Sequence, residues 1–266
     1  MTRARHGPPP GEAHIWAVPE PGPGPRREAV VRRCVELLSP DEVRRWRHVV
    51  PSQRALYASA HAALRAVTAA YSGRPADRIA FVRGRFGKPY VSGDPGLRVS
   101  LSHTDGMSLV AVSRDGPTGV DVERIKPLQD PAGLRRQVLS EWEAARWPAD
   151  CEDDLHSGLF THWTCKEAVL KAMGSGLAGD LTAVRVTPGA RRRGRVTLHA
   201  APGAAARSWT LQLIDVGPEF RAAIAVADGG EVIRLFTLAP GERPVLRPPL
   251  TAPRTIRAPL DKETQS

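Results

Sequence analysis

The hydrophobic pattern of the chain predicts short strands and a few longer helices. Between residues 97 and 101, leucine and valine alternate with arginine and serine, the period-two pattern of a strand with one buried face. From 56 to 71 the apolar side chains recur at helical spacing, and Gly73 can end that helix. Further strands are expected at residues 14–18, 79–82, 109–112, 119–123, 183–187, 196–199, 209–216, 220–227 and 232–238.

Two capping boxes indicate where further helices start. Ser39 and Glu42 flank Pro40, and Ser140 and Glu143 repeat the three-residue spacing. A third helix is expected over residues 159–173, before a pair of glycines.

Helices and short strands occur in both halves of the chain. This distribution predicts an α+β fold of two similar lobes, residues 12–118 and 119–238, with a site in the cleft between them. The proline-rich ends, residues 1–11 and 240–266, are expected to be disordered.

The composition is that of a soluble globular protein. Of the 266 residues 41% are hydrophobic, and no apolar run approaches the about 20 residues that a membrane helix needs. The first ten residues lack the apolar core of a secretory signal. Three scattered cysteines fit neither a disulfide framework nor a zinc spacing, which predicts free thiols in a cytoplasmic protein: Cys34, Cys151 and Cys165.

The net charge of +10 admits several partners. Arginine-rich composition alone explains it, but so does an acidic protein partner, a polyphosphate ligand or a nucleic acid. Aromatic residues are only 5% of the chain and no nucleic-acid-binding motif is present, so nucleic acid is disfavoured.

Lysine is rare in this chain. Of 38 basic residues, 33 are arginine and five are lysine: Lys88, Lys126, Lys166, Lys171 and Lys262. A lysine is a compact ammonium that can also deliver a proton, whereas guanidinium stays charged. Where arginine is the usual cation, a lysine inside a motif is a candidate for a specific task.

Three carboxylates are the main chemical signal. Asp121 and Glu123 alternate with valines in T-G-V-D-V-E-R, so both project from one face of the predicted strand. Glu167 precedes Lys171 by one helical turn in W-T-C-K-E-A-V-L-K. Oxygen donors without a cysteine or histidine cluster suit Mg²⁺, with Mn²⁺ as an alternative, and the lysines suit phosphate.

Simpler explanations exist for each part of this signal. The strand acids also fit an exposed, solvated face, and Glu167 with Lys171 fits an ordinary helical ion pair. A magnesium nuclease of the D…E-x-K kind uses similar groups. The spacing disfavours it, because Lys126 is one position too far from Glu123 and position 169 is valine.

Four motifs in order carry a family resemblance. They are R-F-G-K-P (85–89), V-S-L-S-H-T (99–104), T-G-V-D-V-E (118–123) and W-T-C-K-E-A-V-L-K (163–171). Over about residues 12–235 the chain resembles the surfactin-synthetase-type 4′-phosphopantetheinyl transferases. Thr104 and Thr118 depart mildly from the family pattern.

The resemblance implies a monomer of two lobes related by a pseudo-twofold axis, with coenzyme A as co-substrate in the cleft. The enzyme would move phosphopantetheine from coenzyme A to a serine of an apo acyl or peptidyl carrier domain, in fatty-acid, polyketide or nonribosomal peptide synthesis. Adenosine 3′,5′-bisphosphate would be released. An inactive carrier-binding homologue is the other alternative.

The resemblance also implies residue roles. Asp121, Glu123 and Glu167 would hold the metal, Glu167 would take the serine proton, and Lys171 would stabilise the leaving phosphate. Lys166 is assigned to phosphate binding or packing. The coenzyme A phosphates would be contacted by four further residues, two of which are also candidates for core histidines: His61, Lys88, Ser102 and His103.

The carrier partner would account for part of the basic charge. Carrier domains are typically acidic around the modified serine, so a positive surface would speed the encounter. Segment 125–147 mixes apolar and arginine side chains and is expected to be the docking surface, although ordinary amphipathic packing explains it equally well.

Overall fold

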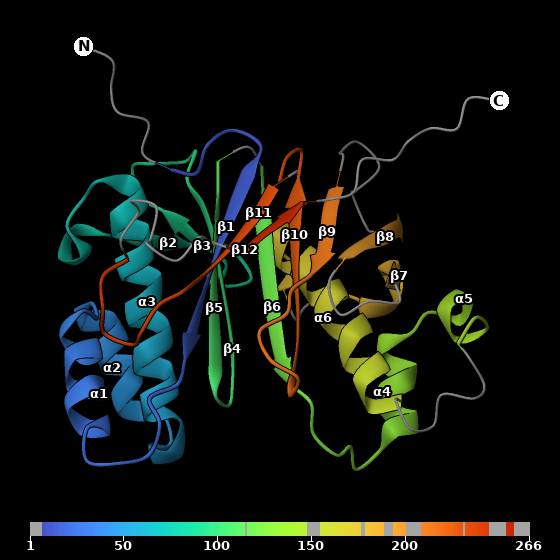
Figure 1. Ribbon diagram of the computed structural model, residues 1–266, viewed down its shortest axis with the longest axis horizontal. Coiled ribbons are helices and arrows are strands. Elements are labelled where there is room, and N and C mark those ends of the chain that lie inside the picture. The colour runs from blue at the N-terminus through green and yellow to red at the C-terminus, as the bar shows by residue number, and fades with distance from the viewer. Residues whose placement is uncertain are drawn as a thin grey trace.

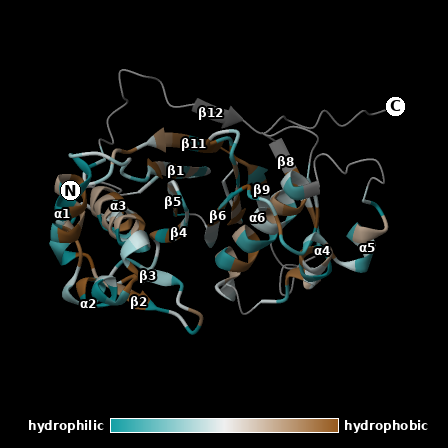
Figure 2. Ribbon diagram, turned by 90° about the horizontal axis from the view of Figure 1, so that it is seen from below, coloured by the Kyte–Doolittle hydropathy of each residue, from teal (hydrophilic) through white to brown (hydrophobic). Residues whose placement is uncertain are grey.

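The computed structural model describes residues 7–114, 116–147, 155–176, 179–188, 194–200, 209–230, 232–244 and 254–257. In this part of the chain two β-sheets lie side by side, with one group of helices beyond each (Figure 1). The view at right angles shows α1–α3 on one side and α4–α6 on the other (Figure 2). The predicted mixed α+β fold is therefore confirmed.

The larger sheet comes mainly from the N-terminal half of the chain. Its strand order is β12-β11-β1-β5-β4-β3-β2, antiparallel except for β11, which runs parallel to β1. The strands are β1 (Glu12–Pro19), β2 (Phe81–Arg83), β3 (Pro89–Val91), β4 (Arg98–Thr104), β5 (Met107–Ser113), β11 (Val232–Thr237) and β12 (Arg254–Arg257).

Helix α3 (Arg54–Ser72) covers one face of this sheet, and α1 (Arg27–Glu36) and α2 (Pro40–His48) pack outside it. Val67 and Tyr71 of α3 share a buried cluster with Trp16 of β1. The predicted capping box at Ser39 is present and starts α2. Short 3₁₀ helices lie at Pro51–Gln53 and Ala76–Arg78.

The smaller sheet comes from the C-terminal half. Its strand order is β6-β10-β9-β8-β7. Helix α6 packs against β6 and β10, and the second predicted capping box starts α5. The elements are β6 (Thr118–Arg124), α4 (Pro131–Val138), α5 (Glu141–Ala144), α6 (Leu155–Met173), a 3₁₀ helix (Leu181–Ala183), β7 (Arg185–Pro188), β8 (Gly194–Ala200), β9 (Trp209–Leu213) and β10 (Phe220–Ala227).

The two sheets meet where β4 lies against β6. Ser100, Ser102 and Thr104 of β4 each accept a hydrogen bond through the side-chain hydroxyl, at 3.1–3.3 Å, from main-chain N–H groups of β6. The donors are Val120, Val122 and Arg124. The alternating hydroxyls of V-S-L-S-H-T thus replace a main-chain ladder and fix β6 beside β4.

Gly119 allows α6 to approach β6 closely. A Cβ at this position would lie 2.0 Å from the carbonyl oxygen of Ala168 and 2.4 Å from the main-chain nitrogen of Ala172. Only glycine lets the strand and the helix make this contact without a shift. Because β6 and α6 carry the candidate site residues, the glycine sets their separation.

Most predicted elements are present, with shifted ends. Predicted strand 79–82 starts only at Phe81, because a 3₁₀ turn precedes it, and predicted strand 209–216 ends at Leu213. The sequence patterns missed α1, α4, β3 and β12. Helix α1 has no side-chain cap and only one buried residue, Cys34, so it lacks the signals that marked the other helices.

The predicted lobe and tail boundaries need correction. Strand β11 lies in predicted lobe 119–238 but pairs with β1 in the larger sheet. Strand β12 lies within predicted disordered tail 240–266 but pairs with β11. At the N-terminal end, Glu12 N–H donates to Pro9 in a turn. Residues 1–6, 245–253 and 258–266, and the thiol of Cys151, lie outside the described residues.

Candidate active site

The three predicted acidic residues line one pocket of about 650 Å³. Asp121 and Glu123 come from β6 and Glu167 comes from α6, so the contact allowed by Gly119 places them together. Asp121 and Glu167 are each only 2% exposed, and Glu123 is half-buried. These three carboxylates are called the acidic end below.

Lys171 joins the acidic end through a short polar network. Its Nζ donates to Oδ1 of Asp121 at 2.6 Å and to Oγ of Ser102 at 2.9 Å. Ser102 in turn donates to the same Asp121 oxygen at 2.8 Å. Lys171 therefore lies at the junction of β4, β6 and α6, where it can reach a group bound in the pocket.

The acidic end holds more negative charge than its surroundings neutralise. Burial, followed by repulsion from Asp121, raises the pKa of Glu123 and that of Glu167 to about 7. Asp121 Oδ2 and Glu167 Oε2 are buried without a hydrogen-bond partner among the described residues. Two unpaired buried carboxylate oxygens in one pocket favour a bound cation or proton.

The donor chemistry at the acidic end fits a hard cation such as magnesium, because every candidate ligand is a carboxylate oxygen. The ligands are not yet gathered around one point. In the described part of the chain no three His, Cys, Asp or Glu side chains are close enough together to hold a metal ion. The predicted metal site is thus not preassembled: the Lys171 ammonium contacts Asp121, and the carboxylates repel each other.

The opposite end of the pocket is basic. It contains side chains from α2, α3, the β2–β3 hairpin (residues 81–91) and the end of β4. They are Arg45, His61, Arg65, Arg83 and His103, called the basic end below. Three arginines and two histidines thus gather at this end, beside the carboxylates of Asp41 and Glu42.

Glu42 organises part of the basic end. Its carboxylate lies 3.5 Å from Nδ1 of His61 and 3.3 Å from Nη1 of Arg65. The ring of His61 stacks on Tyr57 with centroids 4.1 Å apart. His103 is exposed to the pocket, where the surrounding protein and then the nearby cations His61 and Lys171 lower its pKa. Neither histidine is a plain core residue, since both line the pocket.

Comparison with known proteins matches residues 117–226 to the 4′-phosphopantetheinyl transferase superfamily model. The 4′-phosphopantetheinyl transferase HetI of a Nostoc species is 29% identical over 226 residues, which cover 82% of this chain and 89% of that relative. The transferase gsp of Aneurinibacillus migulanus is 31% identical over 103 residues, 39% of this chain and 41% of gsp. The transferase AcpT of Salmonella typhimurium is 32% identical over 106 residues, 40% of this chain and 55% of AcpT.

Residues 117–226 thus match the superfamily model, and the relatives that match the chain are named 4′-phosphopantetheinyl transferases. These matches support the superfamily predicted from the four motifs, while its surfactin-synthetase type stays a prediction. The matched region contains β6 and α6 and hence the whole acidic end. Every residue of the basic end lies outside it, in the N-terminal half.

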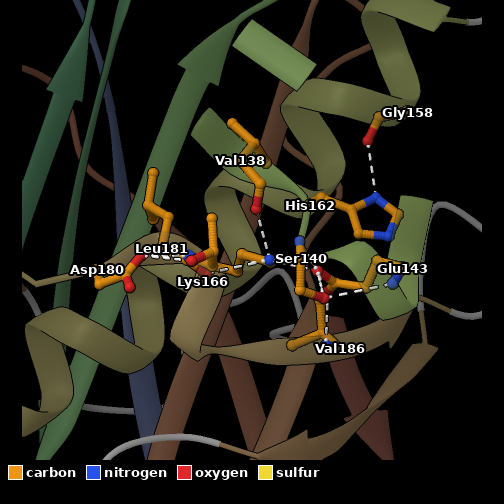
Figure 3. A network of polar contacts seen from close by, with 10 residues as sticks. Val138, Ser140, Glu143, Gly158, His162, Lys166, Asp180, Leu181 and Val186 are labelled. Carbon is orange, nitrogen blue, oxygen red and sulfur yellow. Dashed lines mark hydrogen bonds and ion pairs between the residues drawn. The ribbon is translucent and has the colours of Figure 1, made fainter. Parts of the chain in front are cut away.

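The structure assigns Lys166 to packing and not to phosphate. Its side chain is fully buried, and Nζ contacts Oε2 of Glu143 at 2.6 Å and the carbonyls of Val138 and Leu181 at 2.5 and 3.1 Å (Figure 3). Glu143 also accepts from main-chain N–H groups of Ser140 and Val186. This network gives no support to the predicted cofactor contact of Lys166, because a carboxylate and two carbonyls already occupy the ammonium and the residue does not line the pocket.

Lys88 and Ser102 also differ from the prediction. Lys88 donates to three main-chain carbonyls and is not among the residues of the basic end. Ser102 lines the pocket at the acidic end, where it contacts Asp121 and Lys171 and helps to fix β6. His61 and His103 line the pocket at the basic end, and Glu167 and Lys171 line it at the acidic end, while the predicted coenzyme A contacts of the two histidines stay predictions.

Among the pocket residues that sequence reasoning missed are Glu42, Arg45, Arg65 and Arg83. Three of them are arginines among 33, so composition concealed them. Glu42 was identified only as a capping residue, and it serves the cap and the pocket together.

None of the described helices is long and apolar enough to cross a membrane.

Proposed function

We propose that this chain transfers the 4′-phosphopantetheine group from coenzyme A to a serine hydroxyl of an apo carrier domain. One observation carries the proposal: a single pocket joins a basic end that fits phosphates to an acidic end with a lysine in reach. The matches to proteins named 4′-phosphopantetheinyl transferases support the same reaction and do not favour a nuclease.

Phosphates of coenzyme A would be held at the basic end. His61, Arg65 and Arg45 offer N–H donors there, and His103 lies between them and Lys171. The nucleotide would extend from this end so that its pyrophosphate reaches Lys171 and the carboxylates. Binding at two points would orient the phosphorus for attack.

Glu167 would act as the general base. The serine oxygen attacks the β-phosphorus, its proton passes to Glu167, and the bond from that phosphorus to the bridging oxygen breaks. The nucleotide 3′,5′-bisphosphate leaves with the bridging oxygen. Lys171 stabilises the charge that develops on the oxygen or gives it a proton. In the pocket without an ion, a pKa of about 7 suits Glu167 to accepting a proton near neutral pH.

Asp121, Glu123 and Glu167 would hold a magnesium ion, or manganese in its place, once Lys171 turns from Asp121 toward the phosphate. When bound, such an ion supplies positive charge that offsets charge developing on the pyrophosphate. The unpaired oxygens of Asp121 and Glu167 support this assignment.

Three finer features belong to the same proposal. The two sheets, each with a 19-residue helix, support two lobes near 12–118 and 119–238 related by pseudo-twofold symmetry, with β11 as an exchanged strand. The enzyme would act as a monomer of the surfactin-synthetase type. Its net charge of +10 favours acidic carrier domains of fatty-acid, polyketide or nonribosomal peptide synthesis, with segment 125–147 as the docking surface.

Intact-mass spectrometry of an apo carrier domain tests the reaction. The carrier is incubated with the protein, coenzyme A and Mg²⁺, and a mass gain of one phosphopantetheine is expected. The carrier whose acceptor serine is replaced by alanine should gain nothing. No mass gain on a panel of acyl and peptidyl carriers, with coenzyme A binding intact, would favour the inactive carrier-binding homologue.

A further inference from the structure

We propose that Lys88 is a positioning residue that ties the β2–β3 hairpin to the junction of β6 and α6 and so fixes the acidic end. The inference rests on the proposed function, because the groups that Lys88 positions are those assigned to the transfer. It gives Lys88 a structural task in place of direct phosphate binding.

The Lys88 ammonium makes three main-chain contacts. Its Nζ donates to the carbonyl oxygens of Thr118, Lys171 and Ala172 at 2.9, 2.6 and 2.8 Å. An ammonium has three N–H donors, so these carbonyls use all of them. A phosphate could bind Lys88 only by displacing a carbonyl.

The three carbonyls belong to the two elements that form the acidic end. Thr118 begins β6, three residues before Asp121. Lys171 and Ala172 lie in the last turn of α6, where main-chain carbonyls have no partner within the helix. Lys88 supplies a partner from another part of the fold, beside the Gly174 N–H that also donates to the Lys171 carbonyl, and its positive charge suits the C-terminal end of a helix.

The hairpin around Lys88 fits closely against the end of α6. At Gly174, which follows the helix with φ of +84°, a Cβ would lie 3.3 Å from the Tyr90 hydroxyl and 3.7 Å from Cδ of Lys88. Gly87 has φ of +83° and turns the chain immediately before Lys88. The tie is therefore part of a packed contact between the hairpin and the helix.

Arginine could not replace lysine at this position. A compact ammonium presents three donors in a tetrahedral arrangement, which fits three carbonyls that converge on one point. The guanidinium group is planar, longer and suited to two parallel acceptors. Lys166 shows the same preference, since its buried ammonium also contacts two carbonyls. Two of the five lysines in an arginine-rich chain thus have tasks that depend on this shape.

The tie bears directly on Lys171. Lys88 donates a hydrogen bond to the main-chain carbonyl of Lys171, and the ammonium of Lys171 lies 2.6 Å from Oδ1 of Asp121. Loss of the tie would let the end of α6 move relative to β6, and displacements of about 1 Å in a site can cost 100-fold in rate. Burial, followed by repulsion from Arg98, lowers the pKa of Lys88 to about 7, whereas the three carbonyls act in the opposite direction because they favour the ammonium form.

The test compares Lys88→Met, which removes the donors, with Lys88→Arg, which keeps the charge. We measure kcat in carrier modification and the Kd for coenzyme A by calorimetry with Mg²⁺. Both variants should lose at least about tenfold in kcat, while the Kd changes by less than about threefold. Arg85→Met removes an exposed cation from the same hairpin and should leave both values near wild type.

The opposite pattern would overturn the inference. If Lys88→Met weakens coenzyme A binding tenfold and Lys88→Arg restores it, the residue is a phosphate ligand. If both variants turn over at the wild-type rate, the tie has no role in positioning.

Hydrogen exchange provides a readout that does not need activity. The amides of Gly174 and Ser175, which donate to carbonyls in the last turn of α6, should lose protection in Lys88→Arg while α3 amides keep theirs. Unchanged protection would contradict the tie. If the wild-type protein modifies no carrier, the proposed function fails, whereas this exchange result still decides whether Lys88 holds the helix.

Discussion

The acidic and basic ends of the pocket are built in contrasting ways. The acidic end comes from two elements, β6 and α6, which Gly119 brings into direct contact. The basic end is collected from α2, α3, the β2–β3 hairpin and β4, with few residues from each. The ends also differ in burial: at the acidic end Asp121 and Glu167 are nearly inaccessible and Glu123 is half-buried, whereas at the basic end His61 and Arg65 are buried but Arg45, Arg83 and His103 are exposed.

Because of this difference, we expect the acidic end to carry out the chemistry and the basic end to bind the substrate. Buried carboxylates with raised pKa values and unpaired oxygens are costly to maintain, so they favour a bound cation and proton transfer. The arginines and histidines at the other end contribute mainly to attraction and orientation of a phosphate group. Substitutions at the acidic end should therefore reduce turnover, and those at the basic end should weaken affinity.

The largest effect is expected for Glu167→Gln. The amide keeps the size of the side chain but cannot accept the serine proton, so kcat should fall by about 10³-fold. Carrier modification followed by mass spectrometry measures the rate. Glu28→Gln makes the same change on the exposed face of α1 and should leave the rate unchanged. A Glu167→Gln enzyme that modifies carrier at the wild-type rate would remove Glu167 from its role as base.

Lys171→Met should have the next largest effect. Without the ammonium next to Asp121, charge on the leaving phosphate is not stabilised, and we expect a loss of about 10²-fold in kcat. The Kd for coenzyme A should rise much less. A weaker Kd with unchanged kcat would instead make Lys171 a binding residue and would blur the contrast between the two ends.

The basic end should respond in KM. His61→Ala and Arg45→Ala each remove one cation or donor facing the bound nucleotide, so KM for coenzyme A should rise about tenfold with kcat little changed. Dephospho-coenzyme A, which lacks the 3′-phosphate, should show a smaller difference between wild type and variant. A fall in kcat without a change in KM would contradict the separation of chemistry from binding.

The two ends also differ in how far the sequence could predict them. Each acidic-end residue lies in a dense local motif, because strand periodicity joins Asp121 to Glu123 and one helical turn joins Glu167 to Lys171. At the basic end, Glu42 and Arg65 are 23 positions apart and meet only through the packing of α2 on α3. A contact of this kind produces no local pattern in the sequence, so it could not be predicted.

The same limit explains the errors on Lys88 and Lys166. Both lysines lie in motifs, so the sequence identified them as important. Their partners are main-chain carbonyls from distant segments, such as Thr118 for Lys88 and Leu181 for Lys166. Every residue has a main-chain carbonyl, so residue identity cannot show which carbonyl a lysine contacts. Only the fold shows that these ammonium groups already have hydrogen-bond partners. Strand β11 shows the same limit for the fold. Its apolar pattern predicts a strand but does not indicate that this strand pairs with β1 in the larger sheet.

The pH dependence of stability should distinguish the two ends without any substrate. Glu123 and Glu167 have folded-state pKa values of about 7 against an ordinary value of 4.5. The folded protein therefore holds more protons than the unfolded chain, and the free energy of unfolding in EDTA should fall as pH rises from about 4.5 through 7.

Magnesium should offset this loss. We expect a larger rise in Tm with MgCl₂ at pH 8 than at pH 5.5, because the ion stabilises the ionised carboxylates. The Asp121→Asn variant should show little of the effect, whereas His61→Ala at the basic end should retain it. An equal magnesium response at both pH values would argue against metal binding by these carboxylates.

The smallest effect is expected from removing the segment after Pro244. Strand β12 pairs only with β11, and β11, β1 and β5 lie between it and β4 at the pocket. Loss of this edge strand should lower the free energy of unfolding by no more than about 2 kcal/mol and leave kcat and KM unchanged within about twofold. Urea denaturation and carrier modification measure both quantities. Strand β11 is also paired with β1, so its position does not depend on β12 alone. A large loss of activity would therefore mean that β12 contributes to the site from a distance, and that the two pocket ends depend on the far edge of the larger sheet.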